Sequence, residues 1–270
     1  MSQPKLHIYD SGGSGRPIVM IHGFPLSHEA FQHQLQSLAD ASFRVVAYDR
    51  RGFGRSEKPE AGYDYDTLSD DLKHVIEKFD LTDAILLGFS MGGGEVARFI
   101  SRHSERGVAG LVFAAAVTPY LAKSAENPDG PLDQKTADEK LAALKQDRDG
   151  YFVKFVEKFY SVNDESVVSA QESKKAIALC DQSAQHAAVA CMQAFATTDF
   201  RNDLKRVTVP TLIIHGDSDA VVPFEGSGLR THQTIAHSEL DLIRGGPHGI
   251  NVSHSEQFNK RVIEFARSLD

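Results

Sequence analysis

The feature that constrains this chain most is an apolar run that ends in a glycine-flanked serine and continues as a helix. Residues 84–87 are Ala-Ile-Leu-Leu, and Gly-Phe-Ser-Met-Gly follows at positions 88–92. Val96, Phe99 and Ile100 then recur at the spacing of one helix face. A serine between a buried strand and a helix lies on a sharp turn. Glycines flank it because side chains there would collide with the strand and the helix.

This turn pushes the hydroxyl of Ser90 out of the sheet, beside the first N–H groups and the positive dipole end of the helix. Such a turn can hold both a nucleophile and an oxyanion. The alternative interpretation is a glycine-rich turn that only closes a strand–helix unit, because Gly-x-Ser-x-Gly also occurs by chance. The strand before the serine and the helix after it favour the nucleophile.

Apolar runs alternate with helical patterns along most of the chain. We expect strands at 6–9, 17–21, 43–48, 84–87, 108–117, 209–214 and 239–243, and further helices at about 28–38, 66–79 and 255–269. This alternation predicts an α/β protein with a mostly parallel sheet of about eight strands and helices on both faces. Ligand sites of such sheets gather at the carboxyl ends of the strands, where Ser90 lies.

The pattern changes between residues 118 and 200. This segment is rich in Ala, Lys, Asp and Glu, has no clear strand and is predicted to form several helices. We therefore expect one domain, residues 1–270, with a helical cap inserted at about 119–200. An aromatic cluster in the cap either forms the core of the cap itself or lines a hydrophobic acyl pocket; its members are Tyr151, Phe152, Phe155 and Phe159.

Part of this cluster is expected to line the pocket. Phe155 and Phe159 are four residues apart and therefore share one helix face. We predict that both face Ser90 across the cleft, with Val221 and Phe224 on the side of the sheet.

A serine, an acid and a histidine each follow a predicted strand, in the order Ser90, Asp219, His248. This is the chain order of a catalytic triad on an α/β-hydrolase sheet. A hydroxyl is a poor nucleophile at neutral pH and needs a base. Histidine can accept and return a proton near pH 7, and a carboxylate fixes its tautomer and stabilises the imidazolium.

Composition excludes several classes of partner. The chain has 41% hydrophobic and 24% charged residues and a net charge of −8, without a run of Lys or Arg. Nucleic acid and anionic membranes are therefore not expected as partners. The start has no apolar signal segment, and the longest apolar run, residues 111–117, is too short to span a bilayer. We expect a cytoplasmic protein.

The two cysteines, Cys180 and Cys191, are expected to be buried free thiols. In one continuous helix their spacing would correspond to a rise of about 16 Å, too far for a disulfide. Neither cysteine has the spacing of a zinc ligand to a second cysteine, and no histidine pair has ligand spacing with a third partner nearby. No metal or other cofactor is expected.

Taken together, these motifs resemble the α/β-hydrolase superfamily and, within it, the cofactor-free haloperoxidase (perhydrolase) and arylesterase family. The matching stretches are spread over most of the chain and are residues 22–26, 48–56, 88–98, 197–201, 215–223 and 247–249. The cap is the weakest part of the match.

The resemblance implies roles for the site residues. Ser90 would be the nucleophile, His248 the base and Asp219 the orienting acid, while the backbone N–H groups of Phe24 and Met91 would hold the oxyanion. Some members of the family have a tryptophan where Phe24 stands, whereas this chain has none.

Pro25, which follows the expected oxyanion donor Phe24, is expected to border the pocket. Proline confines the preceding residue to extended conformations, so Pro25 would help to fix where the Phe24 carbonyl points. The perhydrolase-like members of the resembled family have a proline here.

Other residues compete for two of these roles. Asp217 also follows the strand, but the Gly-x-x-Asp pattern of the family selects Asp219 and leaves Asp217 as a turn-capping residue. Among 12 histidines, His22 and His215 end strands and are expected to bond backbone groups, and His254 lies on or before the last helix.

The resemblance implies a serine hydrolase that cleaves small carboxylic (aryl) esters through an acyl-enzyme. Hydrogen peroxide in place of water would yield a peracid, so peroxide and short carboxylic acids are further expected substrates. Epoxide hydrolases and dehalogenases of this fold use Asp at the elbow, and Ser90 argues against both. A ligand receptor or regulatory protein that keeps the triad is the alternative. Members of the family also suggest a homo-oligomer.

Overall fold

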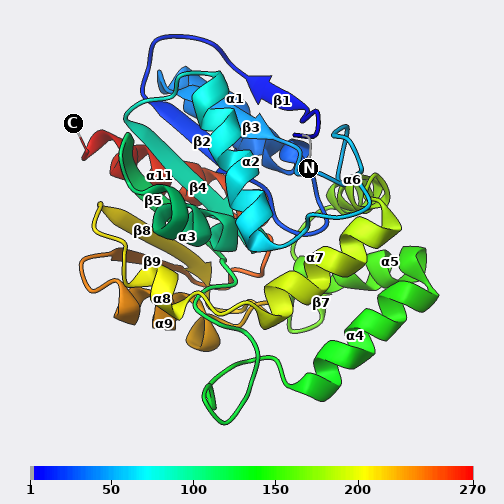
Figure 1. Ribbon diagram of the computed structural model, residues 1–270. Helices are drawn as coiled ribbons and strands as arrows, with labels where there is room; N and C mark the ends of the chain where they lie inside the picture. Colours follow the sequence, from blue (N-terminus) through cyan, green and yellow to red (C-terminus); the bar gives the residue numbers. More distant parts are fainter. Residues whose placement is uncertain (1–2, 270) are drawn as a thin grey trace.

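The centre of the computed structural model, which describes residues 3–269, is a seven-stranded sheet (Figure 1). Its strand order is β1-β3-β2-β4-β5-β8-β9, and only the pair β1–β3 is antiparallel. In chain order the strands are β1 (Ile8–Asp10), β2 (Pro17–Ile21), β3 (Arg44–Tyr48), β4 (Ala84–Phe89), β5 (Val108–Ala114), β8 (Thr211–Gly216) and β9 (Glu239–Ile243). The predicted fold class is confirmed, with seven strands in this sheet and not about eight.

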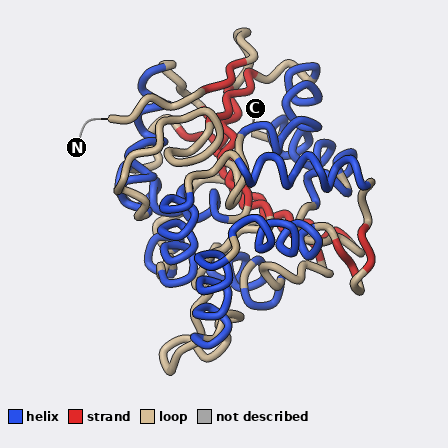
Figure 2. The backbone as a smooth tube through the Cα atoms, turned by 90° about the vertical axis from the view of Figure 1, so that its right-hand side faces the viewer, coloured by secondary structure: helices blue, strands red, loops and turns tan. Residues whose placement is uncertain are grey.

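Helices cover both faces of this sheet. Helices α2 (Tyr65–Lys78) and α3 (Met91–His103) pack together on the front face in Figure 1, whereas α1 (Gln32–Asp40) and α11 (Ser255–Arg267) pack together behind it. The view turned by 90° shows the sheet close to edge-on between helices (Figure 2). Strands β2, β4 and β8 are buried at every position, as expected for strands covered on both sides.

Short elements complete the connections. They are the 3₁₀ turns η1 (His28–Phe31) and η2 (Phe224–Gly226) and the helices α8 (Arg201–Leu204), α9 (Gly228–Thr234) and α10 (Ile250–Ser253). The predicted helix from residue 28 thus begins as a 3₁₀ turn that Ser27 caps through a bond from the Glu29 N–H.

Four of the five helices between β5 and β8 are grouped beyond one end of the sheet (Figure 1). They are α4 (Gln134–Gln146), α5 (Arg148–Phe159), α6 (Ala170–Asp181) and α7 (Gln185–Thr197). The expectation of no strand in this segment is wrong at a small hairpin, β6 (Ser161–Val162) and β7 (Glu165–Ser166). Asn163 and Asp164 form its turn with positive φ angles of 52° and 65°, a conformation that Asn and Asp tolerate.

Cys180 and Cys191 are buried free thiols, as predicted. They lie on separate helices, α6 and α7, because the helical conformation is interrupted at residues 182–184. The separation expected for two cysteines on one continuous helix therefore does not apply to this pair.

Candidate active site

Ser90 lies on the turn between β4 and α3 with φ of 53° and ψ of −117°. The packing around it accepts only glycine at the flanking positions. A Cβ on Gly88 would lie 2.5 Å from the carbonyl oxygen of Gly92, and a Cβ on Gly92 would lie 2.3 Å from that of Ile21. Residues with such φ values cluster at functional sites, because the surrounding structure must hold them there.

The structure brings the three predicted triad residues together. Nε2 of His248 lies 2.9 Å from Oγ of Ser90, and Nδ1 of His248 lies 2.6 Å from Oδ2 of Asp219. All three side chains are buried. Asp219 and His248 follow β8 and β9, so three loops at the carboxyl ends of three strands meet at one point.

Asp219 is held by four donors. Its Oδ1 accepts the N–H groups of Val221 at 2.9 Å and Val222 at 2.8 Å, and its Oδ2 lies 3.2 Å from Nε2 of His215 besides the bond to His248. Burial alone would raise the pKa of the Asp219 carboxyl, but His248 and the bond from His215 lower it strongly. The carboxylate therefore stays ionised beside the histidine.

Asp217 is directed elsewhere. Its side chain is exposed, and its Oδ1 accepts the Gly245 N–H at 2.7 Å and the Ser218 hydroxyl at 2.9 Å. Asp217 thus joins the loops after β8 and β9, and Asp219 alone of the two acids reaches His248.

The other histidines considered bond mainly backbone groups. Nε2 of His22 accepts the Arg50 N–H at 2.9 Å, and Nε2 of His215 donates to the Val222 carbonyl at 2.9 Å. Burial, and to a smaller extent the nearby Arg50 guanidinium, lowers the pKa of His22 to about 3. His254 caps α11. The contact of His215 with Asp219 was not predicted, because sequence spacing cannot show which face of a strand-end histidine meets the acid.

The expected oxyanion donors, Phe24 and Met91, flank the serine. Met91 begins α3, so its N–H has no partner within the helix. A Cβ on Gly23 would lie 2.9 Å from Cβ of Ser90, which shows how closely the loop before Phe24 approaches the nucleophile. Within residues 3–269 neither N–H group donates to another residue, so both can bind a ligand oxygen.

Below these donors lies a buried polar network. The Arg50 guanidinium donates to Glu95 and, at 2.6 Å, to the carbonyl of His22, while the Tyr48 hydroxyl donates to Glu95 at 2.8 Å. Arg51 makes a separate bidentate pair with Asp71 at 2.6 Å. Arg50 and Arg51, in the loop after β3, are thus both paired with buried carboxylates.

A cavity of about 610 Å³ opens from Ser90 toward the helices between β5 and β8. Phe155 and Val221 of the expected pocket residues line it, together with Phe24. Further apolar lining residues that the sequence did not single out are Val117, Leu121, Pro131, Leu132, Met192 and Phe195. They come from an irregular loop and from α7, where no motif marks them.

Three of the expected pocket residues are not among those that line the cavity. The Phe159 ring packs edge-on to the His248 ring, 4.9 Å away between centroids, because the end of α5 approaches the loop after β9. The Phe224 ring packs against the His215 ring, with 5.7 Å between the ring centroids. Pro25 is buried and is not among the residues that line the cavity. The pocket prediction needs correction at these positions.

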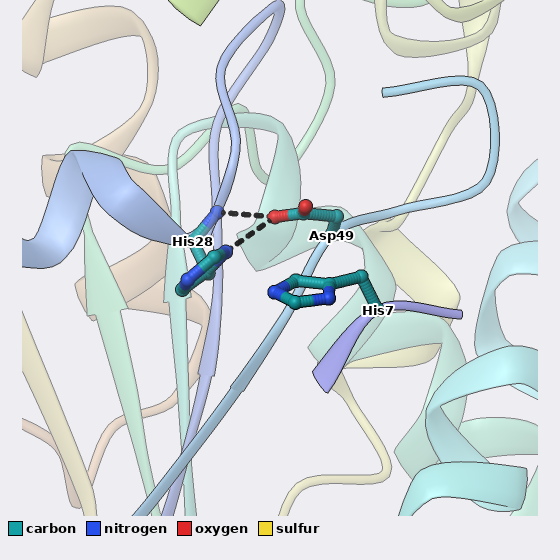
Figure 3. A group of neighbouring side chains, drawn as sticks. All are labelled: His7, His28 and Asp49. Carbon is teal, nitrogen blue, oxygen red and sulfur yellow. Dashed lines mark hydrogen bonds and ion pairs between the residues drawn. The ribbon is translucent and has the colours of Figure 1, made fainter. Parts of the chain in front are cut away.

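One group of side chains has the composition of a metal site. Potential ligand atoms of His7, His28 and Asp49 all lie within 4.8 Å of one another (Figure 3). The Asp49 carboxylate already accepts two hydrogen bonds from His28, one from Nδ1–H at 2.6 Å and one from the backbone N–H at 2.8 Å. It accepts a third from the backbone N–H of Arg55 at 2.8 Å. These bonds indicate a loop anchor, and a metal would have to displace the bond to the His28 ring.

The fold and this site define the class of protein. Residues 16–255 match the family model of the alpha/beta hydrolase fold, so the chain belongs to that family. Its relatives define the branch more closely, since it is 39% identical over 264 residues to a non-heme chloroperoxidase of Kitasatospora aureofaciens, with 95% of this chain and 94% of that protein covered.

Two further relatives support the assignment to the same branch of the family. A bifunctional esterase/perhydrolase of Acinetobacter calcoaceticus is 34% identical, with 96% of this chain and 95% of that protein covered. The crystal structure of a bromoperoxidase from Bacillus anthracis superposes with a TM-score of 0.96 at 42% identity, covering 98% of this chain and 96% of the other. The predicted haloperoxidase and esterase family is confirmed.

The sequence predicted no segment long enough and apolar enough to span a bilayer, and the helices of the structure bear on this prediction. None of those in residues 3–269 combines the length and the apolar composition that crossing a bilayer requires.

Proposed function

We propose that this protein is a serine hydrolase of small carboxylic esters, aryl esters included, that works through an acyl-enzyme. The observation that carries the proposal is the continuous hydrogen-bonded line from Asp219 through His248 to Ser90, at 2.6 Å and 2.9 Å, which ends on a serine that lines the cavity. An acid, a base and a nucleophile in this order are what acyl transfer needs.

Each residue then has a role in the reaction. His248 removes the proton of Ser90 as its oxygen attacks the ester carbonyl, and the N–H groups of Phe24 and Met91 stabilise the oxyanion. His248 returns the proton to the leaving alcohol. Water, deprotonated by His248, then attacks the acyl-enzyme and releases the acid together with free Ser90.

Hydrogen peroxide can replace water in the second half of this reaction. The product is then a peracid, which oxidises halide to hypohalous acid and returns the carboxylic acid. The esterase/perhydrolase of Acinetobacter calcoaceticus and the non-heme chloroperoxidase of Kitasatospora aureofaciens support this side activity by their names. Small esters, hydrogen peroxide and short carboxylic acids are thus the proposed substrates.

The segment of residues 119–200 acts in this proposal as a cap. Its helices line the cavity through residues such as Phe155, while Val221 of the loop after β8 lines it from outside this segment. Acyl groups would lie in this apolar space, as is usual for pockets with few polar groups beside the reacting atoms.

A panel of aryl esters, assayed with and without hydrogen peroxide, tests the proposal. Ser90→Ala should reduce ester turnover by about 10³- to 10⁶-fold, and a fluorophosphonate should label Ser90 in the wild-type protein only. Full activity of Ser90→Ala would refute the assignment of the nucleophile. A complete lack of turnover in the wild type, despite ligand binding, would favour the receptor alternative.

A further inference from the structure

One wall of the cavity is cationic. Lys140 of α4 and Lys154 and Lys158 of α5 line it together with the apolar residues near Ser90. Lys154 and Lys158 are four residues apart and therefore lie on one exposed face of α5, next to the cavity-lining Phe155. The cavity thus combines an apolar part beside the serine with ammonium groups on the cap helices.

No carboxylate of the described residues forms an ion pair with these lysines. Glu139 is the one acidic residue among those that line the cavity, and it pairs with Lys135 at 3.9 Å. The chain as a whole has a net charge of −8, so a cationic wall does not follow from general composition.

Lys140 is the most informative of the three. Its side chain is half-buried, and burial together with the neighbouring Lys158 ammonium lowers its pKa. An ammonium group in partly apolar surroundings is normally paired with an anion. The Asp133 carboxylate opposes this shift from the start of α4 but forms no ion pair with Lys140, so an anion carried by a ligand would fit this position.

We propose that the preferred substrates are esters that carry a carboxylate away from the scissile carbonyl, such as half-esters of dicarboxylic acids. The inference rests on the proposed function. Ser90 attacks the ester carbonyl at the apolar end of the cavity, and the lysines of α4 and α5 hold the distal carboxylate. The apolar lining between them accommodates the methylene chain.

The test compares two aryl esters of equal chain length, the mono-aryl ester of adipic acid and its neutral counterpart with a terminal primary amide. The wild type should show a kcat/KM ratio that favours the anionic ester by about 10-fold, which corresponds to ~1.4 kcal/mol. The preference should fall as ionic strength rises, because salt screens charges near the surface.

Variants locate the preference. Lys140→Met and Lys158→Met should each lower the ratio, and the double variant should bring it close to one. Lys140→Arg should retain it, because the charge remains. Lys145→Met is the matched control, since Lys145 is exposed on the same helix but does not line the cavity; it should leave the ratio unchanged.

The outcomes distinguish this inference from the proposed function. If neither ester is hydrolysed through Ser90, the proposed function is wrong. If the neutral ester is hydrolysed through Ser90 but the ratio is near one or is insensitive to Lys140→Met and Lys158→Met in folded protein, the carboxylate proposal alone is overturned. A variant Lys158→Glu that gains preference for an ester with a terminal ammonium group would support it further.

Discussion

Arg50 donates to the Glu95 carboxylate on α3 and also to the backbone carbonyl of His22. His22 lies two residues before Phe24, and Glu95 lies four residues after Met91. One buried ion pair therefore links the two segments whose N–H groups would hold the oxyanion. Its position suggests that it fixes the separation of the two donors.

Glu95→Gln should test this role because it keeps the shape of the side chain and removes the charge. We expect kcat to fall by about 10-fold with little change in KM, since oxyanion donors act on the transition state and the loss of a whole donor costs about 10²- to 10³-fold. Steady-state kinetics normalised to fluorophosphonate-titrated sites provides the measurement.

Asp71→Asn is the matched control. Asp71 pairs with Arg51 in a similarly buried position but does not contact the His22 carbonyl. It should lower stability and leave kcat per titrated site near that of the wild type. An equal loss of kcat in both variants would mean that the Arg50–Glu95 pair only stabilises the fold.

The two acids after β8 should differ sharply in their effects. Asp219→Asn should lower kcat by about 10⁴-fold, because the amide no longer fixes the tautomer of His248. Asp217→Asn should cost stability of about 1 kcal/mol at most, through the bond to the Gly245 N–H. Kinetics and denaturant unfolding of both variants decide the matter, and the reverse result would exchange the two roles.

The sequence predicted the parts of this site that depend on a local pattern. The elbow around Ser90 follows from the two glycines that the packing of β4, α3 and β2 requires. Asp219 and His248 follow from the rule that parallel strands end at one edge of the sheet. Both arguments need only the order of elements along the chain.

The parts that depend on how separate elements meet were missed. Phe155 and Phe159 share one face of α5, as their spacing predicted, but one lines the cavity and the other packs on His248. The lysines of the cavity wall come from two successive helices whose packing against the cavity no motif marks, and the group around Asp49 comes from three separate segments. Helical spacing shows which residues lie on one face and not what that face contacts.

The two phenylalanines should therefore give different phenotypes. Phe155→Ala enlarges the cavity and should shift the kcat/KM preference toward longer acyl chains. Phe159→Ala should lower stability by about 3–5 kcal/mol, as expected for a fully buried ring, and lower kcat without changing chain-length preference. Kinetics on a series of acyl esters, together with thermal unfolding, measures both. A changed preference in Phe159→Ala would return this residue to the pocket.

Asp49 should make stability depend on pH. Burial alone would raise its pKa, but the bonds from the His28 ring and the Arg55 N–H lower it to about 2. A carboxylate with a lowered folded-state pKa stabilises the fold above the unfolded value and loses this contribution as the pH falls from about 4 to about 2. The shift corresponds to about 2 kcal/mol at neutral pH.

Asp49→Asn should accordingly be about 2 kcal/mol less stable than the wild type at pH 7, and the difference should shrink as the pH approaches 2. Denaturant unfolding of both proteins at pH 7, 5 and 3 provides the comparison. A constant difference across this range would show that the bonds to His28 and Arg55 do not depend on the charge of the carboxylate.

Pro25 is the position at which hydrolysis and perhydrolysis should separate. Proline locks its own φ and confines the preceding Phe24 to extended conformations, so it constrains the Phe24 carbonyl. A carbonyl turned toward Ser90 could accept a hydrogen bond from the distal oxygen of hydrogen peroxide, which water cannot offer at the same reach. Pro25→Leu should therefore lower the ratio of perhydrolysis to hydrolysis.

Ester cleavage by water should stay within about 10-fold of wild type in Pro25→Leu, a change in barrier of ~1.4 kcal/mol or less. Peracid formation from an acetate ester is measured against hydrolysis of the same ester in both proteins. Because both reactions pass through the same acyl group on Ser90, their ratio cancels any loss of folded protein and of acylation rate. An unchanged ratio would mean that Pro25 does not discriminate between water and peroxide, and its role would then be confined to the backbone beside Phe24.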